Sequence, residues 1–256
     1  KSGERRVYED FFDTTLSGIK KDMAEGDTIP LLKAEPKRRV LFMHGMESSP
    51  EGRKHRITRS NYDVICPAMG KYCRKKNWFK NPLFTTSILL FPVSVILTVV
   101  VSVYFIFLTL VAIWMYRKAY YRNIRKCVEI QREAIERFKP EVVIASSWGG
   151  AVAVHCIKRK IWNGPTVLVA PAQSVLARYT LTKKPVLEPE DGIESLLIVH
   201  AFEDKVVPYR DSINLVRKLQ PGSYKIEGVH DNHRLQENFN KTNAKRWVEY
   251  VSRNSQ

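Results

Sequence analysis

Residues 141–150 read EVVIASSWGG, and this stretch decides the fold class. Its first half is a continuous apolar run, which is typical of a strand buried on both faces of a parallel sheet. Its second half holds small residues apart from Trp148, and the apolar segment at 151–157 that follows is predicted to be a helix. A buried strand that turns directly into a helix is a unit of a parallel sheet with helices on both faces.

The same alternation of strands and helices extends on both sides of this stretch. Short apolar runs predict further strands at 39–43, 62–67, 166–170, 195–199 and 223–226. Apolar residues at helical spacing predict helices near 119–138, 210–219 and 237–252. We therefore expect an α/β fold, with a mostly parallel sheet covered by helices.

A serine between small residues marks the turn from strand to helix. Ser147 stands two positions after Ala145 and two before Gly149. A nucleophile elbow of the form G-x-S-x-G needs small residues at these positions, and Ala145 is a mild departure from the usual glycine. Such a turn would present the Ser147 hydroxyl above the sheet, at the start of the following helix. Ser147 is therefore the candidate nucleophile.

A serine hydroxyl becomes a good nucleophile at neutral pH only with a base and a carboxylate beside it. Asp204 is the candidate carboxylate, because it follows a late strand in the stretch FEDKVVP at 202–208. The last strand leads into GVHDNHRL at 228–235, which offers two candidate bases. We favour His233, and His230 is the alternative.

The loop after the first strand reads HGMESSP at 44–50. We expect the backbone N–H groups of Met46 and Trp148 to face an oxyanion that develops beside Ser147. His44 and Gly45, like Gly149, are assigned structural roles, with His44 fixing the loop rather than acting as a base.

Together these motifs resemble the α/β-hydrolase superfamily, and most closely its small serine esterases with HGxxSSP and SSWGG motifs. The resemblance covers roughly residues 39–250, apart from one insertion, and the order Ser, Asp, His along the chain is that of the family. It implies hydrolysis of an ester or thioester through an acyl-enzyme, with Ser147, Asp204 and His233 as the triad and without a metal or organic cofactor. The fold does not specify the substrate.

An uncharged apolar stretch at residues 83–116 is the insertion. It reads LFTTSILLFPVSVILTVVVSVYFIFLTLVAIWMY, which exceeds the roughly 20 residues that a helix needs to cross a bilayer. Pro92 predicts a bend within it. Basic residues on both flanks suit contact with anionic lipid headgroups. These are Lys71, Arg74, Lys75, Lys76 and Lys80 before it, and Arg117, Lys118, Arg122, Arg125 and Lys126 after it.

The positions of the motifs predict how this insertion is arranged. Because His44 precedes it and Ser147 follows it, both of its ends must lie on the same side of a membrane. We therefore expect a membrane-inserted helical hairpin or re-entrant segment rather than a single transmembrane helix. The chain is then divided into an α/β-hydrolase domain at 1–70 and 121–256 and a membrane-associated insertion at 71–120. An active site near the bilayer would suit a lipophilic ester substrate.

Charge and cysteine usage narrow the set of partners. The net charge of +16 favours anionic partners, and its concentration beside the apolar stretch favours membrane lipids over nucleic acid, so no nucleic-acid partner is expected. The four cysteines lack CxxC spacing, which predicts neither a metal site nor a disulfide framework. The chain begins at Lys1 without a signal-peptide core, so we expect a segment upstream of it.

Two classes of function are open at this point. The first is a membrane-bound serine hydrolase, which the complete set of Ser147, Asp204 and His233 favours. The second is a catalytically silent accessory subunit derived from a hydrolase, in which the insertion docks on the helices of membrane-protein partners. The insertion and the high charge favour this second class. Both place the chain at a membrane, with the endoplasmic reticulum and the mitochondrial inner membrane as candidates.

Overall fold

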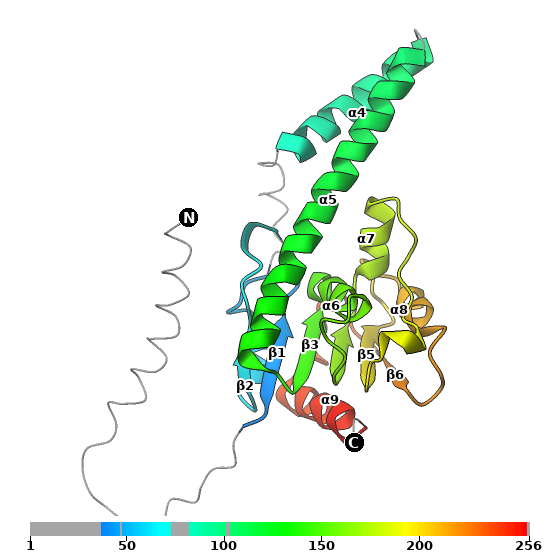
Figure 1. Ribbon diagram of the computed structural model, residues 1–256. Coiled ribbons are helices and arrows are strands. Elements are labelled where there is room, and N and C mark those ends of the chain that lie inside the picture. Colours follow the sequence, from blue (N-terminus) through cyan, green and yellow to red (C-terminus); the bar gives the residue numbers. More distant parts are fainter. Residues whose placement is uncertain (1–36, 47, 73–81, 101–102, 255–256) are drawn as a thin grey trace, which may run out of the picture. The chain divides into compact units, whose positions relative to one another are not determined.

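The computed structural model describes residues 37–254, apart from 47, 73–81 and 101–102 (Figure 1). Its centre is a sheet with the strand order β2-β1-β3-β4-β5-β6, in which every pair of neighbours is parallel. The strands are β1 (Arg39–Met43), β2 (Asp63–Ile65), β3 (Val142–Ser146), β4 (Thr166–Val169), β5 (Leu196–Ala201) and β6 (Tyr224–Val229). The predicted α/β fold with a parallel sheet is confirmed.

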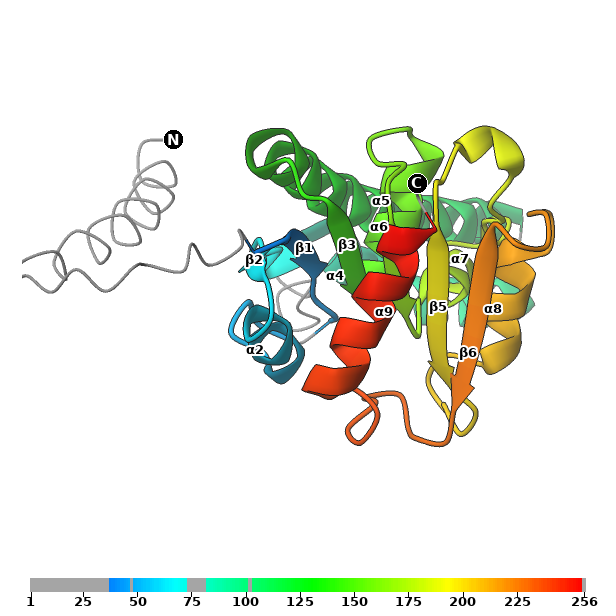
Figure 2. The same cartoon turned by 90° about the horizontal axis from the view of Figure 1, so that it is seen from below.

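Helices cover both faces of this sheet (Figure 2). Successive residues of a strand point to opposite faces, so Val40 and Phe42 join one apolar core while Leu41 and Met43 join the other. The first core is covered by α2 (Arg53–Arg59) and α9 (Lys241–Arg253). The second is covered by α5 (Val103–Phe138), α6 (Trp148–Lys158), α7 (Gln173–Tyr179) and α8 (Tyr209–Val216). Short 3-10 turns lie at Gly70–Tyr72 and Pro189–Asp191.

Several element ends differ from the sequence-based expectation. The strand expected at 62–67 covers only Asp63–Ile65, and the helix expected from 237 begins at Lys241. The cause of the second difference is a cap, since the side chain of Asn240 accepts a hydrogen bond from the backbone N–H of Asn243. The preceding residues form a turn closed by the carboxylate of Asp231.

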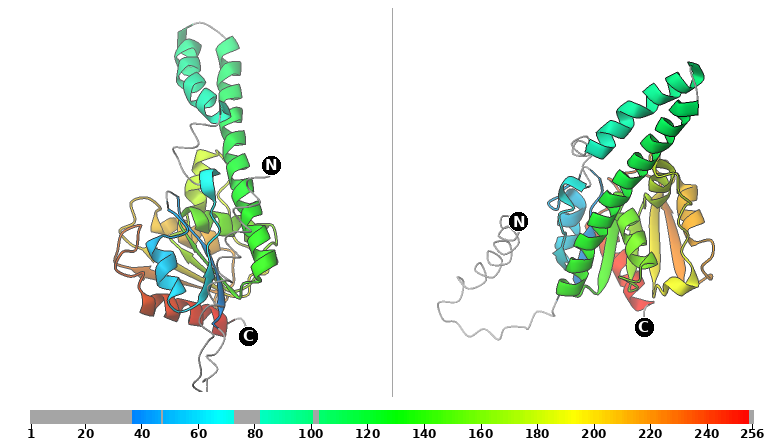
Figure 3. Two further views of the ribbon diagram at one scale, coloured as in Figure 1. Left: turned by 90° about the vertical axis from the view of Figure 1, so that its left-hand side faces the viewer. Right: turned by 45° about the horizontal axis from the view of Figure 1, so that its top comes forward.

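The apolar insertion forms two antiparallel helices, α4 (Pro82–Val100) and α5 (Figure 3). Pro92 lies inside α4. The helix α5 continues past the apolar residues to Phe138, so the expected boundary at 120 falls within one continuous helix whose second half packs on the sheet. Most of the basic flank before the insertion, at 74–80, lies outside the described residues.

In this hairpin two serines are buried while many large apolar side chains are exposed. Ser87 and Ser94 are each 2% exposed, and Thr109 of α5 donates a hydrogen bond to Ser94 of α4 at 2.8 Å. Large apolar side chains are instead exposed, among them Leu89 at 64% and Phe107 at 67%. This arrangement is the reverse of an ordinary surface helix.

None of the helices in the described part of the chain is both long enough and apolar enough to cross a membrane. The transmembrane helix predicted from the length of residues 83–116 is therefore not found among the described helices. The apolar residues are divided between two helices, and α5 carries charged side chains from Arg117 onward.

Candidate active site

A strained turn connects β3 to α6 at Ser147. This residue has φ 53° and ψ −113°, a conformation that residues other than glycine seldom adopt. The turn brings α6 so close to β1 that a Cβ at Gly149 would lie 2.1 Å from the carbonyl oxygen of Met43. Only glycine fits there, which explains the small residue two positions after the serine. The strained turn places Ser147 directly after the carboxyl end of β3.

A continuous series of hydrogen bonds joins three of the expected site residues. The Oγ of Ser147 lies 2.9 Å from Nε2 of His233, and Nδ1 of His233 lies 2.6 Å from Oδ2 of Asp204. The buried carboxylate of Asp204 accepts the N–H of Nδ1, which leaves Nε2 free to accept the proton of the serine hydroxyl. This is the geometry of a nucleophile, a base and a carboxylate that orients the base.

The carboxylate of Asp204 is held in its charged form. Its Oδ1 accepts hydrogen bonds from the backbone N–H groups of Val206 and Val207, both at 2.8 Å, and its Oδ2 lies 3.3 Å from Nε2 of His200. Burial alone would raise the pKa of this carboxyl group. The donors from His200, His233 and Val207 outweigh burial and hold the pKa of Asp204 far below its ordinary value.

His230, the alternative candidate base, is bonded to a residue outside the series from Ser147 to Asp204. His230 has a side chain that is 85% exposed, and its Nδ1 lies 2.8 Å from the carboxylate of Glu203. The loop between the two histidines turns on Asp231, whose carboxylate accepts backbone N–H groups from residues 232 and 236–238. The structure therefore brings His233, and not His230, to Ser147.

Comparisons with known proteins agree on the architecture. The chain is similar to the structure of TT1662 from Thermus thermophilus, with a TM-score of 0.54 at 12% identity over 86% of this chain and 90% of that one. It is similar to Est1E from Butyrivibrio proteoclasticus, with a TM-score of 0.51 at 13% identity over 87% and 90%. It is also similar to an uncharacterized protein from Bacillus cereus, with a TM-score of 0.51 at 13% identity over 94% of this chain and 67% of that one.

The chain has the α/β-hydrolase fold. No protein-family model matches its sequence, and no curated protein sequence matches it. At identities this low, the likeness establishes the fold alone, and the activity must be argued from the site.

The loop after β1, in which the oxyanion donor Met46 is expected, lies against Ser147. His44 accepts the backbone N–H of Met69 on Nε2 at 3.3 Å, and its Nδ1 donates to the carbonyl of Gly45 at 2.9 Å, so His44 fixes the loop in place. A Cβ at Gly45 would lie 3.4 Å from the Cβ of Ser147. Met46 follows in this loop and Trp148 opens α6, at the carboxyl ends of adjacent strands. Their role as oxyanion donors stays a prediction.

One residue of this site had no signal in the sequence. Lys54 of α2 donates a hydrogen bond from Nζ to Oγ of Ser146 at 2.9 Å, directly before the candidate nucleophile, and lies 5.3 Å from the ring centroid of Phe239. Burial, helped by the charge of Arg53, lowers the pKa of Lys54 to about 8, against the opposing charges of Asp231 and Asp204. A lysine in a basic run is normally assigned to a solvated surface, so its contact with the site could not be read from the sequence.

Within the described residues of this hydrolase fold, no group of three or more histidine, cysteine or carboxylate side chains could hold a metal ion. The described cysteines Cys66, Cys127 and Cys156 are free thiols. Burial raises the pKa of Cys156 to about 12, so this thiol stays protonated and unreactive.

Proposed function

We propose that this chain is a serine hydrolase that cleaves an ester or thioester. The observation that carries the proposal is the continuous series of hydrogen bonds from Ser147 through His233 to Asp204. Three residues from three separate loops lie within hydrogen-bond distance in the order that acyl transfer requires. The strained backbone at Ser147 supports the same reading, since such strain concentrates at functional positions.

The proposed reaction follows from this geometry. Nε2 of His233 takes the proton of the Ser147 hydroxyl while Oγ attacks the substrate carbonyl carbon, and backbone N–H groups stabilise the resulting oxyanion. His233 then gives this proton to the leaving alkoxide or thiolate, and the acyl group stays on Ser147. A water molecule, deprotonated by His233, releases the carboxylic acid and restores the hydroxyl. Asp204 stabilises the positive imidazolium in both steps.

We further propose that the substrate is lipophilic and that the hairpin of α4 and α5 docks in a membrane. The apolar side chains that the hairpin exposes exceed what a surface in water ordinarily carries. They are Ile88, Leu89, Phe91, Val93, Val95, Ile106, Phe107, Leu108, Leu110 and Trp114. Insertion into one leaflet from one side would bury them without a crossing, with both ends of the insertion on that side.

The position of the hairpin supports this reading. The side chain of Arg39, at the start of β1, donates a hydrogen bond to the carbonyl of Phe138, the last residue of α5. The end of α5 therefore lies at the amino edge of the sheet, and its first half extends past the carboxyl edge, where Ser147 stands (Figure 3). A membrane that holds the hairpin would hold the active site near its surface.

The charges beside the hairpin suit the same surface. Exposed basic side chains follow the apolar part of α5, and Nζ of Lys118 lies 4.5 Å from the ring centroid of Trp114. A cation beside an interfacial tryptophan is the arrangement found where a helix leaves a bilayer. The exposed basic residues are Arg117, Lys118, Arg122, Arg125 and Lys126.

A fluorophosphonate probe tests the activity, because it reacts only with an activated serine. We expect labelling of the protein and its loss in Ser147→Ala. The second candidate function is a silent accessory subunit that docks its outward apolar faces on partner helices. Absence of labelling in folded protein would select this second function, with the fold retained as a scaffold.

A further inference from the structure

The helix α7 ends on a leucine at a position that is usually glycine. The backbone N–H of Thr182 donates to the carbonyl of Ala177 at 2.9 Å. The backbone N–H of Leu181 donates to the carbonyl of Arg178 at 3.2 Å, which completes a Schellman motif. The residue after the cap in this motif is in the left-handed conformation, and here it is Leu181 with φ 51°. This conformation strains a bulky side chain and would not strain a glycine.

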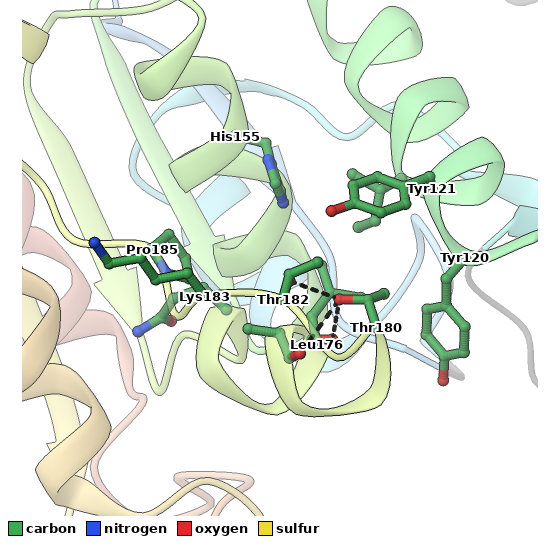
Figure 4. A pocket seen from close by; sticks show the side chains of 11 residues that line it. Tyr120, Tyr121, His155, Leu176, Thr180, Thr182, Lys183 and Pro185 are labelled. Carbon is green, nitrogen blue, oxygen red and sulfur yellow. Dashed lines mark hydrogen bonds between the residues drawn. The ribbon is translucent and has the colours of Figure 1, made fainter. Parts of the chain in front are cut away.

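The side chain of this strained leucine packs little against the fold. Leu181 is 64% exposed. A mostly apolar pocket of about 240 Å³ lies between α5, α6, α7 and the loop at 180–185, and Leu181 does not line it (Figure 4). Tyr121 of α5 and His155 of α6 lie across this pocket from the loop. The backbone strain therefore holds an apolar side chain in solvent although an apolar pocket lies beside it, which indicates a contact outside the fold.

The exposed charges around Leu181 suit anionic headgroups. Arg178, Lys183 and Lys184 are exposed, and no acidic residue occurs between positions 178 and 185. Arg178 and Lys184 both pair with the buried carboxylate of Asp211, each at 3.1 Å, which neutralises one of the three positive charges. The remaining positive charge attracts an anionic surface. We call these three basic side chains, together with Tyr179 and Leu181, the α7 tip.

A pair of stacked rings makes the α7 tip continuous with the base of the hairpin. Tyr179, the last residue of α7, is 54% exposed, and its ring stacks on that of Tyr120 of α5 with centroids 6.1 Å apart. Tyr120 follows Trp114 by six residues, or about 9 Å along the helix. Trp114, beside Lys118, marks where the hairpin is proposed to leave the membrane. The α7 tip is then close to the headgroup layer, which is roughly 5–8 Å thick.

The helix α7 also extends from the sheet in the same direction as the hairpin. The backbone N–H of Ala172, directly before α7, donates to the carbonyl of Ser147 at 3.0 Å, so α7 starts at the carboxyl edge of the sheet. Its other end and the hairpin both lie beyond that edge (Figure 1). A membrane that holds the hairpin would therefore meet the α7 tip as well.

We propose that the α7 tip is a second membrane contact, which binds a surface of anionic phospholipid. Leu181 and Tyr179 enter the interfacial layer, and the basic side chains contact the headgroups. This inference rests on the proposed docking of the hairpin in a membrane and adds an orientation to it. Two contacts prevent the hydrolase domain from turning about the hairpin and keep the carboxyl edge of the sheet, with Ser147, towards the bilayer.

Binding of the full chain to vesicles of phosphatidylcholine and phosphatidylserine tests the apolar part of this contact. Leu181→Gly should weaken binding about tenfold, because a leucine no longer enters the lipid. The same change should not lower the urea midpoint of unfolding, because the position favours glycine. Leu181→Met keeps an apolar side chain and should bind like the original protein. Ile213→Ser on α8 is the matched control outside the α7 tip and should leave binding unaltered.

The charged part of the contact has its own test. Lys183→Gln should weaken binding to vesicles that contain phosphatidylserine about fivefold and leave binding to phosphatidylcholine alone unaltered. Lys160→Gln, which changes an exposed lysine after the far end of α6, is the matched control and should bind normally.

Two outcomes separate this inference from the proposed docking of the hairpin. Unaltered binding of both Leu181→Gly and Lys183→Gln, with binding lost when exposed apolar residues of the hairpin are changed to serine, would overturn the α7 tip as a membrane contact. The hairpin would then bind the membrane alone, and the α7 tip would be left for a protein partner. Failure of the original protein to bind vesicles would instead refute the docking of the hairpin, and this inference with it.

Discussion

Nε2 of His200 lies 3.3 Å from Oδ2 of Asp204, the same carboxylate oxygen that His233 contacts. Nδ1 of His200 lies 2.6 Å from the hydroxyl of Ser212, and its Nε2 lies 2.9 Å from the carbonyl of Val207. Because that carbonyl can only accept, Nε2 carries the proton and Nδ1 accepts from Ser212. The fully buried His200 is therefore a positioning residue that holds Asp204 for His233.

His200→Phe should lower kcat by roughly tenfold, the effect of losing about 1.5 kcal/mol from one hydrogen bond to a charged group. It should also raise the pKa of Asp204, because a donor to the charged form is gone. The acid end of the profile of unfolding free energy against pH then moves to higher pH. His200→Gln, which keeps an N–H donor, should restore part of both effects. A profile that does not move in the phenylalanine variant would limit His200 to a packing role.

Asp204→Asn should lower kcat by about 10⁴-fold, because an amide that donates to Nδ1 of His233 leaves the wrong tautomer facing Ser147. Single-turnover kinetics with an activated ester measures this loss. Far-ultraviolet circular dichroism of the variant is the control for folding. Activity within tenfold of the original protein would contradict the assigned role of Asp204.

Asp204 should also make the fold sensitive to acid. Its pKa is depressed in the folded state, so its ionised form stabilises the fold above the unfolded-state pKa of about 3.9. That contribution is lost as the pH falls from about 4 towards the lower folded-state pKa. Urea unfolding at a series of pH values should show a steeper loss of stability below pH 4 in the original protein than in Asp204→Asn. The same loss of stability below pH 4 in both proteins would contradict the assignment of this acid sensitivity to Asp204.

Lys54 should give a dependence of the same sign at alkaline pH. Its pKa of about 8 in the folded state lies below the ordinary lysine value, so the unfolded chain binds more protons between about pH 8 and 10.4. The free energy of unfolding should therefore rise across this range, by an amount on the order of 1–3 kcal/mol. Lys54→Met should remove the rise. A similar rise in the free energy of unfolding of Lys54→Met would show that other groups cause the rise.

The hairpin should determine membrane binding. The triple variant Leu89→Ser, Phe107→Ser and Leu110→Ser removes exposed apolar side chains and should abolish flotation with anionic phospholipid vesicles. Ile213→Ser, which changes an exposed apolar side chain on α8, is the matched control and should float normally. Equal flotation of the two variants would show that the hairpin is not the membrane-binding surface.

Gly149→Ala should destabilise the fold by roughly 1–3 kcal/mol, since the added methyl group would overlap the carbonyl of Met43. The matched control is Gly192→Ala, where a Cβ would meet no atom within 4 Å and only the positive φ of 69° opposes the change. Chemical denaturation of both variants measures the difference. A smaller loss of stability in Gly149→Ala than in Gly192→Ala would contradict the close approach of Gly149 to the carbonyl of Met43.

Much of the site could be predicted from the sequence because a parallel sheet gathers its strand ends. Ser147, Asp204 and His233 each follow an apolar strand, and the carboxyl ends of parallel strands meet at one edge. The choice between His230 and His233 could not be derived in this way, since both follow β6. It depends on the turn that the carboxylate of Asp231 closes.

The sequence by itself determined the α/β class and the triad candidates, because both rest on local patterns: apolar runs of strand length and small residues around a serine. Only the tertiary structure decided that Lys54 reaches Ser146, that His200 supports Asp204, and that the serines of the hairpin face inward. These contacts join side chains from separate elements, and their geometry depends on how the helices pack. No pattern along the chain records such a distance.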